Sequence, residues 1–219
     1  VKANDVTATT TNSNVKIKGN GTGVVSLGDG NLLFPDADGS SGQAITTNAS
    51  GQLAFSTISS AHTEETPLAT TSGTQITFGS LPSGITEIII ACEGVSNTTT
   101  VDWFLELGDA GGLETSGYLS STMAIENSAQ VGIKGASNFV LKNVNAAAAT
   151  SNILIRLNLV DASAFLWSFE STCINATGTV AEEITIGGGF KALTAELTQV
   201  SVNVVSGAFD LGTVHCLHR

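Results

Sequence analysis

Residues suited to acid–base chemistry are few in this 219-residue chain, which has 19 acidic residues but only three histidines. Nucleophilic catalysis needs a hydroxyl or thiol beside a base and an orienting group. His62 lies outside any strand pattern, and His215 and His218 lie at the end of the chain, so no triad is indicated. Glycoside hydrolysis needs two carboxylates across a groove. Four acidic residues lie close enough in sequence to be considered: Asp102, Glu106, Asp109 and Glu114. We expect them to be solvated surface charges and predict that the chain is not an enzyme.

Two short patterns have the residue types of metal sites. The segment Asp36-Ala37-Asp38-Gly39 begins like an EF-hand calcium loop, but Ser40, Ser41, Gly42 and Gln43 follow, where that loop needs further oxygen ligands and a final Glu. His215 and His218 flank a Cys-Leu pair, and on a strand their odd separation turns them to opposite faces. We therefore predict a turn at the first pattern and no metal or other cofactor.

Phosphate and nucleic-acid binding are also disfavoured. The glycines at 111–112 and 187–189 are expected to form tight turns, with no following helix whose N-terminus would hold a phosphate. Nucleic acid needs Lys and Arg to neutralise its phosphates, whereas this chain has eight such residues and a net charge of −11.

No apolar stretch approaches the roughly 20 residues that span a bilayer, so we expect no membrane insertion. Three cysteines in apolar runs are expected to be buried free thiols: Cys92, Cys173 and Cys216.

Sugar binding uses polar loop side chains and a stacked aromatic ring. Trp103 and Trp167 lie on apolar strand faces and are expected in the core, which leaves Tyr118 and Phe104 as the better exposed rings. Three loops are polar tips between expected strands, at residues 94–100, 108–117 and 143–152. The candidate receptor-binding residues on these tips are Asn97, Thr99, Asp109, Tyr118 and Asn145.

The elements that would position these tips are β-strands. Five segments have strand length and many β-branched or aromatic residues: 85–93, 101–107, 152–160, 164–174 and 199–205. Alternation places Trp103, Leu105 and Leu107 on one face of their strand, and Ile153, Ile155, Leu157 and Leu159 on one face of theirs. Ser-Gly, Gly-Asp and Asn-Thr turns separate such strands. This pattern predicts an all-β head, an antiparallel, jelly-roll-like sandwich at residues 74–219.

The N-terminal part has a different pattern. Residues 15–58 consist of apolar bursts three to five residues long, separated by Gly, Asp, Asn and Ser, which is too little for a core of its own. Gly30 to Phe34 is repeated 21 residues later as Gly51 to Phe55. We therefore predict a glycine-punctuated trimeric β stem in which partner chains complete the core. Its expected core residues are Leu32, Phe34, Leu53 and Phe55. Residues 1–14 are expected to be a linker or the end of a longer stem, and residues 59–73 a linker.

The head and the stem both resemble parts of tailed-bacteriophage and prophage tail fibres. In the head, a Gly-x-x-Pro-x-Gly turn (79–84), Leu-Gly-Asp-Ala-Gly-Gly (107–112) and Glu-Thr-Ser-Gly-Tyr (114–118) occur in the family's order, and residues 189–219 are similar to its last strands. Residues 19–30 and 39–55 are similar to the modules that precede fibre heads.

The resemblance implies a homotrimeric receptor-binding fibre or spike on the virion, extracellular on release. Its partners would be other tail or baseplate proteins at the N-terminal end and a host surface glycan or outer-membrane protein. Two alternatives stay open: a structural virion decoration without a receptor, and a glycan-degrading tailspike.

Overall fold

The computed structural model describes residues 26–27, 32–33, 35, 39–47, 52–57, 61–126, 129–145, 147, 149–177 and 180–219. The chain divides into two compact units, Val1–Ser60 and Ala61–Arg219, and each is considered by itself. All regular elements in the described residues are β-strands, so the prediction of an all-β chain is confirmed. None of these residues belongs to a helix long and apolar enough to cross a membrane.

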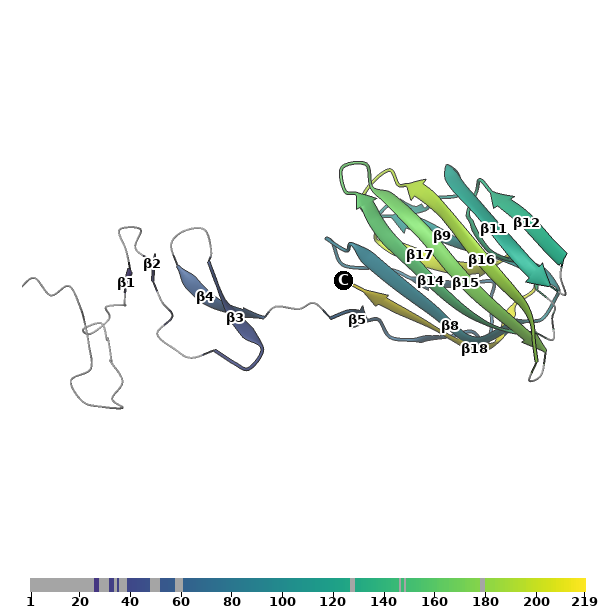
Figure 1. The fold of residues 1–219 in the computed structure, drawn as a ribbon, viewed down its shortest axis with the longest axis horizontal. Helices are drawn as coiled ribbons and strands as arrows, with labels where there is room; N and C mark the ends of the chain where they lie inside the picture. The colour runs from purple at the N-terminus through teal and green to yellow at the C-terminus, as the bar shows by residue number, and fades with distance from the viewer. Residues whose placement is uncertain are drawn as a thin grey trace, which may run out of the picture. The chain divides into compact units, whose positions relative to one another are not determined.

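The first unit contains two short antiparallel hairpins (Figure 1). Strands β1 (Ser26–Leu27) and β2 (Leu32–Leu33) form one, and β3 (Gln43–Thr47) and β4 (Leu53–Thr57) form the other. In the second hairpin Leu53 and Phe55 are half-buried. The ring of Phe55 covers Gly39, where an added Cβ would lie 2.5 Å from ring atom Cδ1.

Part of the predicted stem cannot be compared with the structure. Phe34 and the Asp36–Asp38 turn lie outside the described residues, and Leu32 is described only as a strand residue. Ile45, the cross-strand partner of Phe55, is 49% exposed. This unit therefore offers apolar side chains that its own described residues do not cover.

The second unit is a sandwich of two antiparallel sheets (Figure 1). The large sheet has the order β12-β11-β16-β15-β14-β8-β18-β5, with β6 also paired to β18. Its strands are β5 (Thr63–Glu64), β6 (Leu68–Ala69), β8 (Glu87–Asn97), β11 (Tyr118–Glu126), β12 (Ala129–Gly135), β14 (Thr150–Asp161), β15 (Leu166–Thr177), β16 (Val180–Ala192) and β18 (Phe209–His218). The small sheet has the order β10-β9-β17-β7, with β13 paired to β9. Its strands are β7 (Gln75–Phe78), β9 (Val101–Asp109), β10 (Gly112–Leu113), β13 (Phe139–Asn145) and β17 (Gln199–Val204).

One hydrophobic core lies between the two sheets. The inward residues expected from alternation are in it, including fully buried Trp103 and Leu105 from the small sheet and Ile155 and Leu157 from the large one. Aromatic rings join the layers. Trp103 meets Phe209 edge-on at 5.3 Å between ring centroids, and Phe139 stacks on Phe169 at 4.4 Å. These contacts have the separations at which aromatic pairs attract.

The three cysteines are free and buried, as predicted. Burial raises the pKa of Cys173 and Cys216 to about 12, and it raises that of Cys92 further. All three thiols are therefore protonated and unreactive at neutral pH.

The two ends of the sandwich are distinguished by where its strands begin and finish. Strand β5 pairs with the last residues of β18, so the chain enters this unit at the end where β8 begins and β18 finishes; we call this the proximal end. The turn at residues 98–100 and the turn at 205–208 lie at the opposite, distal end, where β8 and β17 finish. The expected linker is residues 59–73, and its described part, 61–73, contains β5 and β6 on the sheet edge. Two-residue strands are too short for alternation to indicate them.

Candidate functional site

The structure separates the five candidate receptor-binding residues between the two ends. Asn97, Thr99 and Asn145 lie at the distal end, where Asn145 pairs with Val101. Asp109 and Tyr118 lie at the proximal end. The five residues therefore do not form one site.

At the distal end, Asn97 supports the core. Its side chain is fully buried; Oδ1 accepts a hydrogen bond from Trp103 Nε1 at 2.8 Å, and Nδ2 donates to the carbonyl of Thr99. The exposed residues at this tip are the threonines at 98–100 and, in the second turn, residues 205–207. The backbone of Thr98 donates to the carbonyl of Ala208 at 2.8 Å, and the Thr98 hydroxyl accepts from Ala208 N at 3.1 Å. Two turns, 98–100 and 205–208, are thus joined into one rigid polar tip.

Tyr118 is not an exposed platform, and this prediction is wrong. The residue is 2% exposed, and its ring meets Phe139 edge-on at 4.9 Å. Its hydroxyl donates to the carbonyl of Glu114 at 2.8 Å and accepts from Leu107 N at 2.9 Å. Burial raises the pKa of this hydroxyl. Successive side chains of β11 point to opposite faces of the sheet. Tyr118 points to the core face, and the next side chain, Leu119, points outward and is 72% exposed.

Two of the four carboxylates meet at one hydroxyl at the proximal end. Thr194 Oγ1 lies 2.7 Å from Asp109 Oδ2 and 2.9 Å from Glu114 Oε1, and Glu114 also forms an ion pair with buried Lys191. The expectation of solvated surface charges is wrong for these two residues, because a turn 80 residues further along the chain provides their partners.

The electrostatics of this pair do not suit acid catalysis. The hydrogen bond from Thr194 and that from Gly111 N lower the pKa of Asp109. Burial would raise the pKa of Glu114, but hydrogen bonds from Lys191 and Thr194 lower it overall. Glycoside hydrolysis needs one carboxylic acid that stays protonated. Both groups are ionised at neutral pH, so this arrangement stabilises a turn instead of supplying a proton.

The terminal histidines face opposite sides of β18, as predicted. His218 pairs with core residue Ile88, while His215 pairs with Ala91 on the other face. His218 Nε2 lies 2.9 Å from Glu65, and His215 Nδ1 lies 3.0 Å from Glu64. No group of three or more metal-ligating side chains is found in the part of the chain that the structure describes.

The glycines at 187–189 do not form the tight turn expected; they lie inside strand β16. A Cβ at Gly189 would lie 2.2 Å from the carbonyl of Leu119, and one at Gly187 would lie 2.6 Å from Ser171 Oγ. The glycines thus allow β11 and β15 to approach β16 closely. In contrast, Gly111-Gly112 does form a turn, with a φ of 121° at Gly112.

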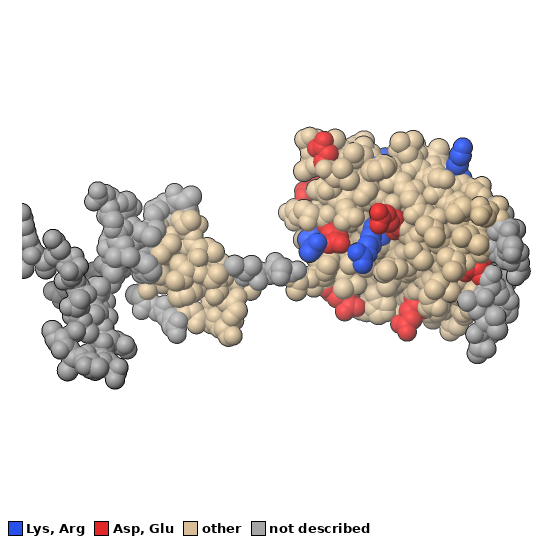
Figure 2. Space-filling model, in the orientation of Figure 1, with Lys and Arg blue, Asp and Glu red and all other residues tan. Residues whose placement is uncertain are grey.

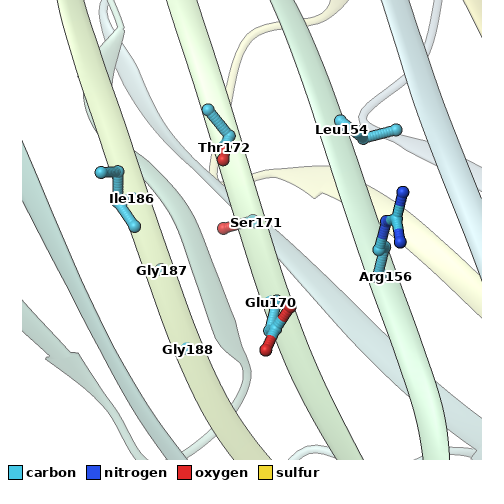
Figure 3. Close-up of a pocket in the computed structure, with 8 residues that line it drawn as sticks. All are labelled: Leu154, Arg156, Glu170, Ser171, Thr172, Ile186, Gly187 and Gly188. Atoms are coloured by element: carbon cyan, nitrogen blue, oxygen red, sulfur yellow. The ribbon is translucent and has the colours of Figure 1, made fainter.

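These glycines also open a depression on the outer face of the large sheet, the side turned away from the core (Figure 3). It measures about 520 Å³ and is bordered by Leu154 and Ile186, with Arg156 and Glu170 beside it. Ser171 borders its base, but the Ser171 side chain shares the inward face with its cross-strand partner Ile155; it is 4% exposed, and its hydroxyl has no hydrogen-bond partner among the described residues.

The depression has no catalytic set. Its remaining lining residues are Thr172, Gly187 and Gly188, so the lining contains no histidine, lysine or cysteine that would activate Ser171. It combines apolar walls with one positive and one negative side chain, which suits contact with another molecular surface. Sequence reasoning missed this site because residues 180–192 were not recognised as a strand; the alternation of Ile184, Ile186 and Phe190 is the signal that indicates it.

Comparison with known proteins finds no family model, curated protein or solved structure that matches this chain.

Proposed function

We propose that this chain is an attachment protein of a bacteriophage virion, the C-terminal part of a homotrimeric tail fibre or spike whose sandwich head binds the host cell surface. The observation that supports this most directly is the polarity of the head. The chain enters at the proximal end, after two glycine-rich hairpins, and a polar tip stands at the opposite end. An adhesive head carried on a stalk needs this arrangement.

The distal tip is the part that we propose to meet the receptor. Its threonine hydroxyls are exposed, and its two turns are tied by the hydrogen bonds between Thr98 and Ala208. A rigid tip loses little conformational entropy on binding. Three such tips on one trimer would add avidity to weak single contacts, because the second and third contacts are intramolecular.

Adhesion is favoured over glycan cleavage by the state of the two carboxylates that converge at Thr194; burial raises the pKa of Glu106, but Glu106 is not part of that pair. Asp109 and Glu114 are the two that converge, and their lowered pKa values keep both ionised. A tailspike that cuts glycan would need one of them protonated. A virion decoration without a receptor remains the second alternative, and binding measurements separate it from an attachment protein.

The test compares one exposed residue at each end of the head. Thr100→Arg places a long charged side chain on the distal tip, and Ser116→Arg places the same side chain at the proximal end; both residues are exposed. Binding of the full chain is measured on bacterial cells of the strain that the virion infects and on their extracted surface polysaccharide. We expect Thr100→Arg to weaken binding by about tenfold or more, since several tips of one trimer are affected together, and Ser116→Arg to leave it unchanged.

The outcomes separate the three functions. Binding without release of reducing ends supports adhesion, and release of reducing ends from the polysaccharide would instead show a tailspike. Failure of the unmodified chain to bind the cells would contradict attachment and favour decoration. Equal loss in both variants would contradict the distal location of the site.

A further inference from the structure

The outer face of the large sheet is unusually apolar across β11, β14, β15 and β16. Eight large apolar side chains on it are between 39% and 72% exposed: Leu119, Met123, Ile125, Leu154, Ile174, Ile184, Ile186 and Phe190. Isolated apolar residues on a surface are ordinary, but a contiguous apolar patch indicates contact with another molecule. The space-filling view shows this side of the head largely tan, with blue and red atoms gathered left of its centre and separate red patches toward its lower edge (Figure 2).

The eight side chains are contiguous because strand pairing places them in rows. One row runs from Ile125 to Ile184 and on to Ile174, which are successive cross-strand partners. A parallel row runs from Met123 to Ile186 and, through Thr172, to Leu154. Directly opposed residues on one face of a sheet have Cβ atoms about 5 Å apart, so each row is a continuous strip.

The charged group in the middle of the face offers both signs of charge to a neighbouring copy. Arg156 on β14 and Glu170 on β15 are directly opposed. Both are exposed and belong to the described part of the chain, yet no ion pair joins them. Among the described side chains of this face, one positive and one negative group thus stand side by side, and each can meet the opposite charge of a neighbouring copy.

We propose that this outer face is the contact between the heads of neighbouring copies of the same chain. The inference rests on the proposed homotrimer and specifies the surface through which its three heads contact one another. Around a three-fold axis, the Ile184 and Ile186 strips of three copies pack together, and Arg156 of each copy pairs with Glu170 of the next. The distal tip stays free in this arrangement, because 98–100 and 205–208 lie at the strand ends and not on the face.

The size of the face suits a contact that acts together with the stem. Three strand spacings of about 4.8 Å and seven residues at about 3.4 Å give a projected area on the order of 300 Å². A stable interface usually removes about 800 Å² per partner. The head contact is therefore modest alone, and apolar side chains of the stem would add to it.

Solvent labelling of a single new cysteine tests this contact in the full 219-residue chain. Ile184→Cys lies on the outer face, and Val205→Cys, at a site that is 64% exposed in the distal turn and away from that face, is the control. The native thiols stay silent because all three are buried. We expect N-ethylmaleimide to modify Ile184→Cys about tenfold more slowly than Val205→Cys, since a packed interface excludes solvent.

Light scattering gives the molar mass of the same samples. It tests the homotrimer independently of the contact between heads, which the labelling rates test. A trimer in which both cysteines react at the same rate would overturn the head contact and leave the trimer standing. A monomeric wild-type chain would overturn the trimer and, with it, the contact.

Charge reversal provides a second measurement that does not depend on labelling. Glu170→Arg puts like charges together between copies and should shift the trimer toward monomer, and Arg156→Glu should do the same. The double variant Arg156→Glu with Glu170→Arg should restore the trimer, while circular dichroism confirms that each variant is folded. Failure of the double variant to restore assembly would overturn the proposed charge pairing.

Discussion

At the scale of single residues, Thr194 shows how a distant side chain changes the meaning of a local sequence. Asp109 and Glu114 look like loop charges in the sequence, but the hydroxyl of Thr194 lies within 2.9 Å of both. Lys191, which is 4% exposed, completes the group through its ion pair with Glu114. Four side chains from two parts of the chain thus hold residues 109–114, the segment that contains β10.

This group predicts a pH-dependent contribution to stability. Thr194→Val keeps the shape of the side chain but removes its hydroxyl, and we expect it to lower the free energy of unfolding at pH 7 by about 1 kcal/mol. The carboxyl pKa values are lower in the folded chain, so the stabilisation is complete above the unfolded values of about 3.9 for Asp and 4.3 for Glu. It declines as the pH falls toward the folded values. Urea unfolding of wild type and variant at several pH values measures the difference.

Thr115→Val is the control, because Thr115 is exposed in the same turn. A difference between wild type and Thr194→Val that stayed constant from pH 7 down to pH 3 would show that the hydroxyl does not act through the carboxylates.

At the scale of elements, the glycines of β16 show why a strand was mistaken for a turn. Glycine weakens most strands and is typical of turns, so three in succession indicate a break. Here the backbone of β11 and the side chain of Ser171 occupy the space that side chains at 187 and 189 would need. The neighbouring strands, not local propensity, decide the residue type at these positions.

The space around each glycine predicts opposite outcomes for adjacent substitutions. Gly189→Ala would put a methyl group 2.2 Å from the carbonyl of Leu119, so we expect a loss of about 2 kcal/mol in the free energy of unfolding. Gly188→Ala should be neutral or slightly stabilising, because the nearest atom, the carbonyl of Phe169, is 3.8 Å away. Guanidinium unfolding of the two variants measures both, and equal stabilities would contradict this account of β16.

At the scale of the whole molecule, the chain joins two units with different sources of stability. The head has a core that its own two sheets enclose, including Trp103, Trp167 and Phe169. The first unit has only short hairpins in its described residues, with Leu53 and Phe55 half-buried. We therefore expect the first unit to depend on partner chains and the head to fold largely by itself.

Two substitutions in the second hairpin test this dependence. Leu53→Ser together with Phe55→Ser removes apolar area that we propose is shared between copies, and at roughly 25 cal/mol per Å² this area contributes several kcal/mol per trimer. The melting temperature of the trimer should fall, while the unfolding of the head, followed by Trp fluorescence, should change little because both tryptophans belong to the head. An unchanged trimer melting temperature would remove the case for a shared stem core.

Patterns in the sequence are enough to predict the class of the fold and much of the core. Alternation is a local property of an extended backbone, so it correctly placed Trp103, Leu105, Ile155 and Leu157 inside and turned His215 and His218 to opposite faces. It also indicated buried free cysteines, since thiols in apolar runs behave as small hydrophobic groups.

The tertiary structure sets the positions that depend on long-range pairing. It turned Tyr118 into the core, brought Thr194 to Asp109, and placed Gly189 against the backbone of β11. It also aligned Ile125, Ile184 and Ile174 into one exposed strip, although they come from three strands. The register between strands sets each of these contacts, and register joins residues whose separation along the chain gives no sign that they will meet.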